Sequence, residues 1–290
     1  MRVGVIGSEA QVTSRSLARA WRAAGIDALV VTPEEASRLL DAGDVAVGRL
    51  DVLPTLDGVE PGIHVLDLLS KRGVRVLNPG AALLAAHDKL ETADLLRRAH
   101  VPHPQTFHVR TAHEPVPLAP PLVVKPRFGS WGRDVFLCRD ASELDECLAD
   151  VWARRWFRRD GALVQALVPP RFHDVRVIVG GGRIVGAARR RAATGEWRTN
   201  VSLGGELSPV ELDRTARALA LAAAAAVGMD LVGVDLLPLE GDAYTVIELN
   251  GAAEFDGRYA LPGGDVYLDA AAGLGLRGSS VGGDVRHVSA

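Results

Sequence analysis

The sequence predicts a mixed α/β (α+β) fold. In the first third of the chain, short apolar runs alternate with segments that have apolar residues at helical spacing, as in open α/β sheets. Farther on, apolar runs follow one another in pairs, which is typical of neighbouring strands. The 290 residues are 48% hydrophobic, so the chain can bury a sizeable core and divide into two or three subdomains.

The first third predicts a small N-terminal α/β domain over residues 1–88. MRVGVIG is expected to form a strand, SRSLARAWRAAG a helix that ends at Gly25, and DALVVT a second strand. The turn GVIGS is similar to the start of a dinucleotide fingerprint, but G-x-G-x-x-G is not completed and no acidic residue is placed to hold a ribose. We therefore expect no nucleotide at this turn.

The next segment predicts a central subdomain over residues 89–165. LETADLLRRAH has apolar residues at helical spacing, and the two prolines of VPHPQTFHV end that helix. PLVVKPRF and DVFLC are expected to be paired strands. One helix is expected over SELDECLADVWARRWFRRDG, with Ser142 as its N-cap and Gly161 at its end, and the strand ALVQALV follows it.

Residues 166–278 predict a C-terminal subdomain. Strands are expected at DVRVIVGG and RIVGAARRRA, and a pair of strands bearing acids at LVGVDLLPL and AYTVIELNG. Between them, a helix is expected over residues 209–228, with Ser208 as N-cap, Pro209 at the first position and Glu211 completing a capping box. The glycine-rich tail 279–290 is expected to be disordered.

Composition excludes several classes of protein. The net charge of −3 argues against nucleic acid as the main partner. The longest apolar run, ALALAAAAAVGM, is too short to span a bilayer, and the N-terminus has no signal-peptide core, so we expect a cytoplasmic protein. Cys138 and Cys147 have neither disulfide-framework nor metal-ligand spacing and are expected to be free thiols.

The stretch VVKPRFGSWGRDVFL, residues 123–137, predicts an anion-binding loop between two strands. Its glycines let the backbone approach a ligand closely, and bare N–H groups with basic side chains suit a phosphate. Lysine is rare in this chain, because only Lys71, Lys89 and Lys125 occur among 33 basic residues. Lys125 opens the loop as a compact charge that can reach between phosphate oxygens, although the three lysines could also be solvated positions.

Acids on the last predicted strand pair favour a Mg²⁺ site. Asp235 lies in GVDLL and Glu248 in VIELN, and Asn250 shares a strand face with Glu248. These hard oxygen ligands suit Mg²⁺, and their apolar neighbours argue for a function, because buried carboxylates are costly unless paired or metal-bound. Two acids that reach the surface at strand ends are the alternative.

Basic residues precede these acids on consecutive strand-like segments. Alternation directs Arg189 and Arg191 to one face and Arg190 to the other, so one face is expected at the site and one in solvent. Arg176, Arg198 and Asn200 are further candidates, each with a solvated position as the alternative.

Seven segments in order resemble the RimK/LysX branch of the ATP-grasp carboxylate–amine ligases, over most of residues 75–270. They are HDKLET, VVKPRFGSWGR, VQALV, DVRVIV, RRRAATGEWRTNVSLGG, GVDLL and VIELNGAAEF. The resemblance implies an ATP-grasp fold preceded by the small N-terminal α/β domain. It also identifies the glycine-rich stretch as the family's flexible loop over the ATP phosphates.

The resemblance further implies roles for individual residues. ATP would be bound by Lys89 and Lys125, by the glycine loop and by a backbone hinge at Val164–Val168; the assigned nucleotide-site residues besides the lysines are Gly129, Ser130, Trp131, Gly132, Arg133, Gln165, Ala166, Leu167, Val168 and Asp174. Two Mg²⁺ ions, with Mn²⁺ as an alternative, would be bound by Asp235, Glu248 and Asn250. The groups for phosphate and substrate carboxylate would be Arg176, Arg190, Arg198 and Asn200.

The implied activity is ADP-forming ligation through an acyl phosphate. A glutamate-like amino acid would be joined to a carboxylate on a small acidic carrier protein or a small molecule, by a dimer or tetramer. GSWGR and the N-x-x-x-E-F pattern are closer to the LysX-like branch, whereas Ala166 replaces a usual Glu and Gly251–Ala253 lacks the Thr and Met of the lysine-pathway enzymes, so their substrate is not assumed.

Two other functions are compatible with the same motifs. They are a non-catalytic ATP-binding regulatory module and a peptide ligase of natural-product assembly. The basic and aromatic segment ARRWFRRD, residues 153–160, could dock an acidic carrier or could be a solvated helix end. His87, His103 and His173 lack ligand spacing and are interpreted as ordinary polar positions.

Overall fold

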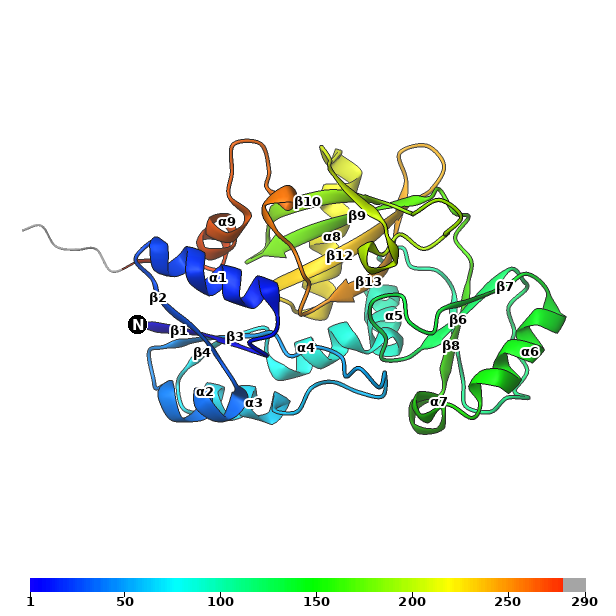
Figure 1. Ribbon diagram of the computed structural model, residues 1–290, viewed down its shortest axis with the longest axis horizontal. Helices are drawn as coiled ribbons and strands as arrows, with labels where there is room; N and C mark the ends of the chain where they lie inside the picture. Colours follow the sequence, from blue (N-terminus) through cyan, green and yellow to red (C-terminus); the bar gives the residue numbers. More distant parts are fainter. Residues whose placement is uncertain (279–290) are drawn as a thin grey trace, which may run out of the picture.

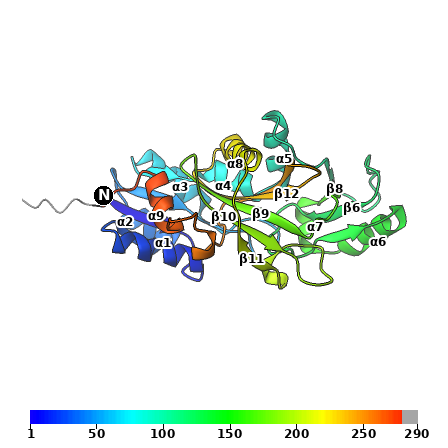
Figure 2. The ribbon, with the colours of Figure 1, turned by 90° about the horizontal axis from the view of Figure 1, so that it is seen from above.

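A computed structural model describes residues 1–278, and the predicted disordered tail 279–290 lies outside the described residues. Three β-sheets follow one another along the long axis of the molecule (Figures 1 and 2). Within residues 1–278, no helix is both long enough and apolar enough to cross a membrane.

The N-terminal sheet is parallel, with the strand order β2-β1-β3-β4. Its strands are β1 (Arg2–Ile6), β2 (Asp27–Val31), β3 (Val45–Gly48) and β4 (Arg75–Leu77), and its helices are α1 (Val12–Ala23), α2 (Pro33–Leu39) and α3 (Ile63–Lys71). Successive side chains of β1 point to opposite faces of the sheet. Val3 and Val5 pack toward α1, whereas Ile6 packs toward α2 and α3. The predicted N-terminal strand–helix–strand order is confirmed.

The central sheet is antiparallel, with the order β5-β8-β6-β7. Helices α4 (Gly80–His87) and α5 (Lys89–Arg98) lead into it. Its strands are β5 (Thr106–Val109), β6 (Leu122–Pro126), β7 (Phe136–Cys138) and β8 (Ala162–Ala166), and its helices are α6 (Ala141–Val151) and α7 (Arg155–Asp160). We call this unit, residues 106–166, the central lobe. It forms one end of the molecule (Figure 1).

The C-terminal sheet is antiparallel, with the order β11-β10-β9-β12-β13. Its strands are β9 (His173–Gly180), β10 (Arg183–Arg191), β11 (Glu206–Pro209), β12 (Leu231–Pro238) and β13 (Tyr244–Asn250). Helix α8 (Arg214–Val227) covers one face and α9 (Val266–Gly273) the other, and two short helical turns lie at Val201–Leu203 and Gly257–Tyr259. This sheet shares both of its apolar cores with the N-terminal sheet, so those two sheets are packed as one body.

The predictions of two helix starts were wrong. The helix expected from residue 209 begins at Arg214 with Asp213 as its N-cap, because Ser208 and Pro209 pair with β10 as part of β11. The helix expected over residues 142–161 is two helices, α6 and α7, and the N-cap of α6 is Asp140, two residues before the expected Ser142. In both places an aspartate side chain accepts a hydrogen bond from a backbone N–H group of the first turn.

A loop from the N-terminal half, residues 51–60, reaches into the central lobe. Leu56 is buried in the apolar core that the central lobe otherwise forms from its own residues. Beside it, the carboxylate of Asp57 lies 2.6 Å from Arg155 Nε and 3.7 Å from Arg159 Nη1 of α7. Trp156 and Phe157 of the same helix are buried, so residues 153–160 do not present their aromatic side chains to a carrier protein.

The turn between β9 and β10 gives a stability test. A Cβ atom added to Gly181 would lie 1.9 Å from the carbonyl oxygen of Gly273 at the end of α9, whereas one added to Gly182 meets nothing within 4 Å. Both glycines have positive φ angles. We expect Gly181→Ala to lower the free energy of unfolding by about 3 kcal/mol or more, and Gly182→Ala by about 1 kcal/mol from backbone strain alone. Equal losses in urea unfolding of the two variants would contradict this packing.

Candidate active site

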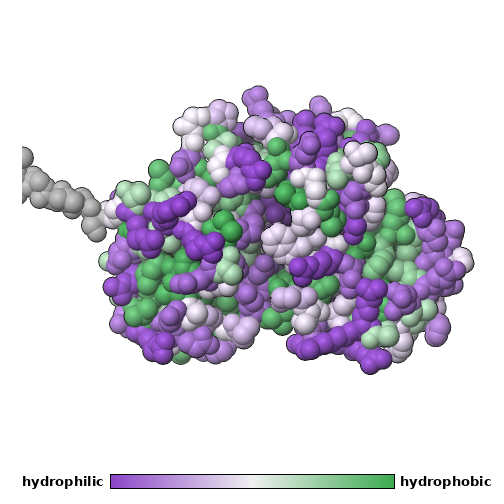
Figure 3. All heavy atoms as spheres, viewed as in Figure 1, coloured by the Kyte–Doolittle hydropathy of each residue, from purple (hydrophilic) through white to green (hydrophobic). Residues whose placement is uncertain are grey.

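Two adjoining cavities lie where the central lobe meets the C-terminal sheet. The first is lined by the glycine loop, residues 165–174 and the two lysines Lys89 and Lys125. The second is lined by Arg176, Asn250 and residues 252–256, 258 and 259. Five residues line both cavities: Ser130, Trp131, Arg190, Asn200 and Glu248. Figure 3 shows the surface hollowed between the two ends of the molecule.

The structure brings most of the sequence-predicted residues to these cavities. The first cavity is lined by all of the assigned nucleotide-site residues except Arg133, and it also includes Arg190, Arg198, Asn200, Asp235 and Glu248. Arg176 and Asn250 line only the second cavity. Arg133 is exposed and lines neither cavity. Two of the expected hinge amides are already engaged, because Ala166 N donates to Gln105 and Leu167 N to Pro121.

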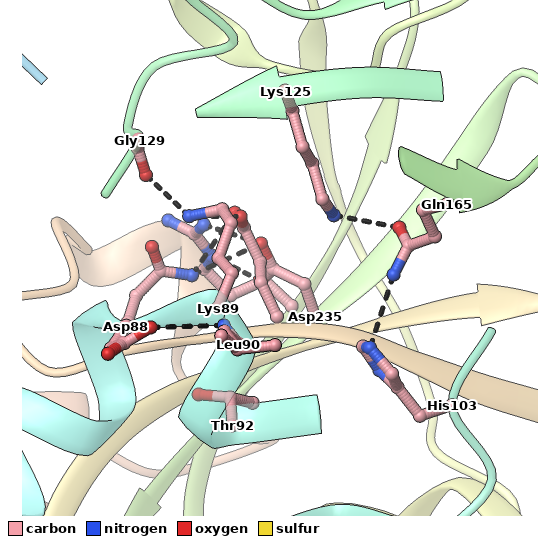
Figure 4. Close-up of polar contacts among 12 residues, drawn as sticks. Asp88, Lys89, Leu90, Thr92, His103, Lys125, Gly129, Gln165 and Asp235 are labelled. Atoms are coloured by element: carbon pink, nitrogen blue, oxygen red, sulfur yellow. Dashed lines mark hydrogen bonds and ion pairs between the residues drawn. The ribbon is translucent and has the colours of Figure 1, made fainter. Parts of the chain in front are cut away.

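Lys125 is buried on β6 and points into the first cavity (Figure 4). Its ammonium group donates to Gln165 Oε1 at 2.7 Å. Burial and then the charge of Lys89 lower the pKa of Lys125 to about 7, and the carboxylate of Glu248 opposes that shift. A cation that is this poorly compensated inside the protein is suited to bind an anion that enters the cavity.

Lys89 joins the glycine loop to the acids. It is the first residue of α5, and its Nζ donates to Gly129 O at 2.5 Å and lies 3.4 Å from Glu248 Oε2. The preceding residue, Asp88, caps α5 and accepts two hydrogen bonds from Arg127 at 2.7 and 2.5 Å. The start of the loop is therefore fixed to the start of α5. Neither Asp88 nor Arg127 was singled out from the sequence.

The tip of the glycine loop rests on the segment that follows β10. Trp131 and Gly132 both have positive φ angles, which places this turn in the region that glycine favours. Arg198 Nη1 donates to Gly132 O, and Ser202 Oγ donates to Trp131 O, each at 3.0 Å. The loop thus lies at the boundary between the two cavities.

Acids and arginines alternate across the C-terminal sheet. Strand register places Asp235 opposite both Arg176 and Glu248, and Arg190 opposite Asp174. Arg176 donates to both oxygens of Asp235 at 2.7 Å, while Arg190 donates to both oxygens of Asp174, at 2.8 and 2.5 Å, and to Asp235 Oδ2 at 2.8 Å. The burial of Asp235 would raise the pKa of its carboxyl group, but the charges of Arg176 and Arg190 hold that pKa well below its usual range.

The three predicted metal ligands lie together and offer the right kind of donor atom. Asn250 Nδ2 lies 3.3 Å from Asp235 Oδ2 and 3.5 Å from Glu248 Oε1. Oδ2 of Asp235 already accepts from both arginines, but Oδ1 accepts one hydrogen bond only and keeps a lone pair. The carboxylate oxygens at this site therefore fit Mg²⁺, with Asp235 contributing one oxygen. Asn250 directs its amide N–H group at both acids, so its amide would have to rotate to offer an oxygen to a metal ion.

The second cavity contains residues that the sequence did not single out. Val12 and Asp51 come from the N-terminal half, and Glu254 and Tyr259 follow β13. Glu254 is held in place because both the backbone N and Oγ1 of Thr13 donate to its Oε2, at 3.0 and 2.8 Å. The second cavity thus has arginines on the side that adjoins the first cavity, and acids among its other lining residues. Only the Glu of NGAAEF was part of a quoted motif, and no pattern marked Asp51.

Comparisons with known proteins show the family to which the chain belongs. The sequence model of the RimK-like ATP-grasp domain matches residues 86–265. A probable alpha-L-glutamate ligase of Thioalkalivibrio sulfidiphilus is 30% identical over 286 residues, covering 92% of each chain, and the glutamate–LysW ligase ArgX of Sulfolobus acidocaldarius is 28% identical over 221 residues, covering 73% of this chain and 77% of the other.

The fold also matches a solved structure. A RimK domain ATP-grasp protein from Sphaerobacter thermophilus superposes with a TM-score of 0.67 at 22% identity, over 94% of this chain and 99% of the other. ATP-grasp proteins use ATP and a divalent metal, which fits the lysines and the oxygen ligands described above. The chain therefore belongs to the RimK-like ATP-grasp family and is an ADP-forming ligase that makes carbon–nitrogen bonds.

Proposed function

We propose that this ligase joins a glutamate-like amino acid, through its amine, to a carboxylate carried by a small acidic protein or by a small molecule. The observation that carries the proposal is the meeting of the two cavities at Arg190, Asn200 and Glu248. The first cavity has the two lysines and is covered by the glycine loop, and the second cavity has both arginines and acids. Opposite charges in one cavity suit a zwitterionic amino acid, and the relatives named above are glutamate ligases.

We assign the binding of ATP to the first cavity and the binding of the amino acid to the second. In the first cavity, Lys89 and Lys125 contact the phosphates of ATP. The substrate carboxylate attacks the γ-phosphorus, the bond to the β,γ-bridging oxygen breaks, and ADP leaves. Arg176 and Arg190 orient the carboxylate and the transferring group, with Arg198 and Asn200 at the cavity boundary. Asp174 positions Arg190 through its two hydrogen bonds.

The second step forms the amide bond. The amine attacks the acyl carbon of the acyl phosphate and inorganic phosphate leaves. Closure of residues 127–134 excludes water, which would otherwise hydrolyse the acyl phosphate. Two Mg²⁺ ions, or Mn²⁺ in their place, would be held by Glu248, Asn250 and one oxygen of Asp235, and would supply neutralising charge to the phosphates. A cytoplasmic location and assembly into dimers or tetramers stay predictions of the sequence.

The metal ligands give a direct prediction. Glu248→Gln removes a charged oxygen ligand while it keeps the shape of the side chain, so we expect the concentration of Mg²⁺ needed for half-maximal activity to rise on the order of tenfold or more. Glu240→Gln, at an exposed position on the strand-connecting turn, is the matched control. A Mg²⁺ titration of ADP release checks both variants. An unchanged titration for Glu248→Gln would remove this residue from the metal site.

The substrates are identified by Mg²⁺-dependent ADP release across a panel of amino acids and candidate carboxylates, including a small acidic carrier protein. Release that requires both an amine and a carboxylate, and that disappears in Lys125→Ala, would support the proposal. Tight binding of ATP without ADP release for any combination would contradict it and favour a regulatory ATP-binding module.

A further inference from the structure

A chain of hydrogen bonds connects Lys125 to the C-terminal sheet through the buried Gln165 and the half-buried His103, and Figure 4 shows it from Lys125 to His103. Lys125 Nζ donates to Gln165 Oε1 at 2.7 Å, and Gln165 Nε2 lies 3.1 Å from His103 Nε2. His103 Nδ1 lies 2.8 Å from the carbonyl oxygen of Val246 on β13. The chain thus starts on β6, crosses β8 and the connector before β5, and ends on a strand of the other sheet.

The direction of every hydrogen bond in this chain is fixed. The carbonyl of Val246 can only accept, so Nδ1 of His103 must carry the proton and donate. Burial and then the charge of Lys125 lower the pKa of His103 to about 4, so its ring is neutral at pH 7. Nε2 of a neutral ring that is protonated at Nδ1 has a free lone pair, and it therefore accepts from the amide of Gln165.

This arrangement holds the Gln165 amide in one orientation. Its second N–H donates to Thr106 Oγ1 at 2.8 Å, and Thr106 in turn donates to Pro104 O at 2.9 Å. A reversed amide would direct its oxygen at the lone pair of His103 and its N–H groups at the ammonium of Lys125. Both contacts are repulsive, so the acceptors His103 and Thr106 keep Oε1 toward Lys125.

We propose that His103 is a positioning residue for nucleotide binding. It orients Gln165 so that the amide oxygen of Gln165 accepts one hydrogen bond from the ammonium group of Lys125. The two other N–H groups of Lys125 are then free to bind the phosphates. This inference rests on the proposed role of Lys125 in binding ATP. Because Val246 N also donates to Pro102 O at 2.9 Å, the same connector joins Lys125 to the sheet that bears the acids. His103 therefore fixes Lys125 relative to both sheets.

Three substitutions separate this role from simple anchoring of the connector. His103→Asn can keep the donor to Val246 but is too short to give Gln165 an acceptor. His103→Gln can place an acceptor near the position of Nε2. Thr106→Val removes the other acceptor of the Gln165 amide and does not touch β13. If His103 only anchored the connector to Val246, His103→Gln would be more harmful than His103→Asn, because only the asparagine keeps a donor for Val246, and Thr106→Val would leave ATP binding unchanged.

The experiment measures the dissociation constant of a non-hydrolysable ATP analogue by titration calorimetry, with KM for ATP and kcat from ADP release. We expect His103→Asn to raise the dissociation constant and KM about tenfold while kcat changes much less, His103→Gln to stay within about threefold of the wild type, and Thr106→Val to act in the direction of His103→Asn.

A pH profile of binding adds a readout that unfolding alone would not change. The charged groups that face Lys125 are Lys89 and Glu248, with the neutral His103 and Gln165 beside it. Without the oriented amide oxygen the ammonium of Lys125 is less stable, and its pKa falls further. As the pH rises, ATP binding by His103→Asn should therefore begin to weaken at a lower pH than ATP binding by the wild type. Wild-type affinity and pH profile in His103→Asn, or a loss of affinity in His103→Gln that is as large as in His103→Asn or larger, would overturn the inference. A wild type that binds no analogue would instead refute the proposed function.

Discussion

Lys125→Met is expected to weaken ATP binding by about a hundredfold and, at the same time, to make the folded protein more stable. The loss of affinity follows because a buried ammonium makes charge-assisted hydrogen bonds to phosphate that a thioether cannot make. The gain in stability follows because Lys125 is buried, has an amide oxygen as its only hydrogen-bond partner among the described residues, and lies near the like charge of Lys89.

The lowered pKa of Lys125 also predicts how the stability of the wild type depends on pH. The folded-state pKa of Lys125 is about 7, whereas an unfolded lysine has a pKa of about 10.4. Between these values the unfolded chain binds more protons, so wild-type stability should rise with pH from 7 to 10, and the full penalty is present below pH 7. The penalty is on the order of 3–5 kcal/mol, partly offset in the variant by the lost partner of Gln165, which costs about 1–3 kcal/mol.

Urea unfolding at pH 7 and pH 9.5 tests the prediction. At pH 7 the methionine variant should exceed the wild type by roughly 1–3 kcal/mol, and the difference should shrink or reverse at pH 9.5. Lys71→Met, at an exposed end of α3, is the matched control and should change neither stability by more than about 0.5 kcal/mol nor ATP affinity. A less stable Lys125→Met variant at pH 7 would show that the site compensates the charge better than its contacts indicate.

Asp235→Ala is expected to have the largest effect on stability, a loss of about 3–5 kcal/mol, together with loss of ligase activity. The substitution leaves Arg176 without its carboxylate partner and removes one of the two acids that Arg190 contacts. All three side chains are largely buried, so water cannot replace the missing partner at low cost.

The pH range of this effect is also defined. The pKa of Asp235 is lowered below the value of an unfolded aspartate, so its contribution is present above about pH 4 and is lost only in strong acid. The loss in Asp235→Ala should therefore be constant from pH 6 to pH 9. Asp242→Ala, exposed on the turn between β12 and β13, is the control. A loss below about 1 kcal/mol in thermal or urea unfolding would mean that the arginines find other partners.

Local sequence signals predicted the strands well and two helix starts poorly. Alternation correctly assigned Arg190 to the face opposite Arg189 and Arg191 on β10, and the structure shows that Arg190 is the buried one. Ser208 and Pro209 have the composition of a helix start, but pairing with β10 across the sheet outweighs that local preference. The true N-cap, Asp213, lies only a few residues farther on. A single sequence does not show which of two neighbouring cap residues the tertiary structure uses.

In the site, residue type predicted which side chains carry charge but not which of them pair. Lys125, Glu248 and Asn250 could be selected because lysine is rare and hard oxygen ligands are recognisable. The contact of Asp235 with two arginines depends on strand register, and the contact of His103 with Val246 joins residues 143 positions apart. His103 was interpreted as an ordinary polar position, and the only local signal for it is its place between two prolines.

The insertion of Leu56 into the central lobe determines which segments must be exchanged together in chimeras of related proteins. The core of that lobe is closed by a side chain from a loop that lies roughly fifty residues before the lobe begins, and Asp57 adds ion pairs at the same contact. A fragment limited to residues 99–172 would have a hole in its core, and Arg155 on α7 would lose its ion-pair partner. Chimeras that exchange the central lobe between relatives should therefore also exchange residues 51–60, because the central lobe does not form its core from its own residues alone.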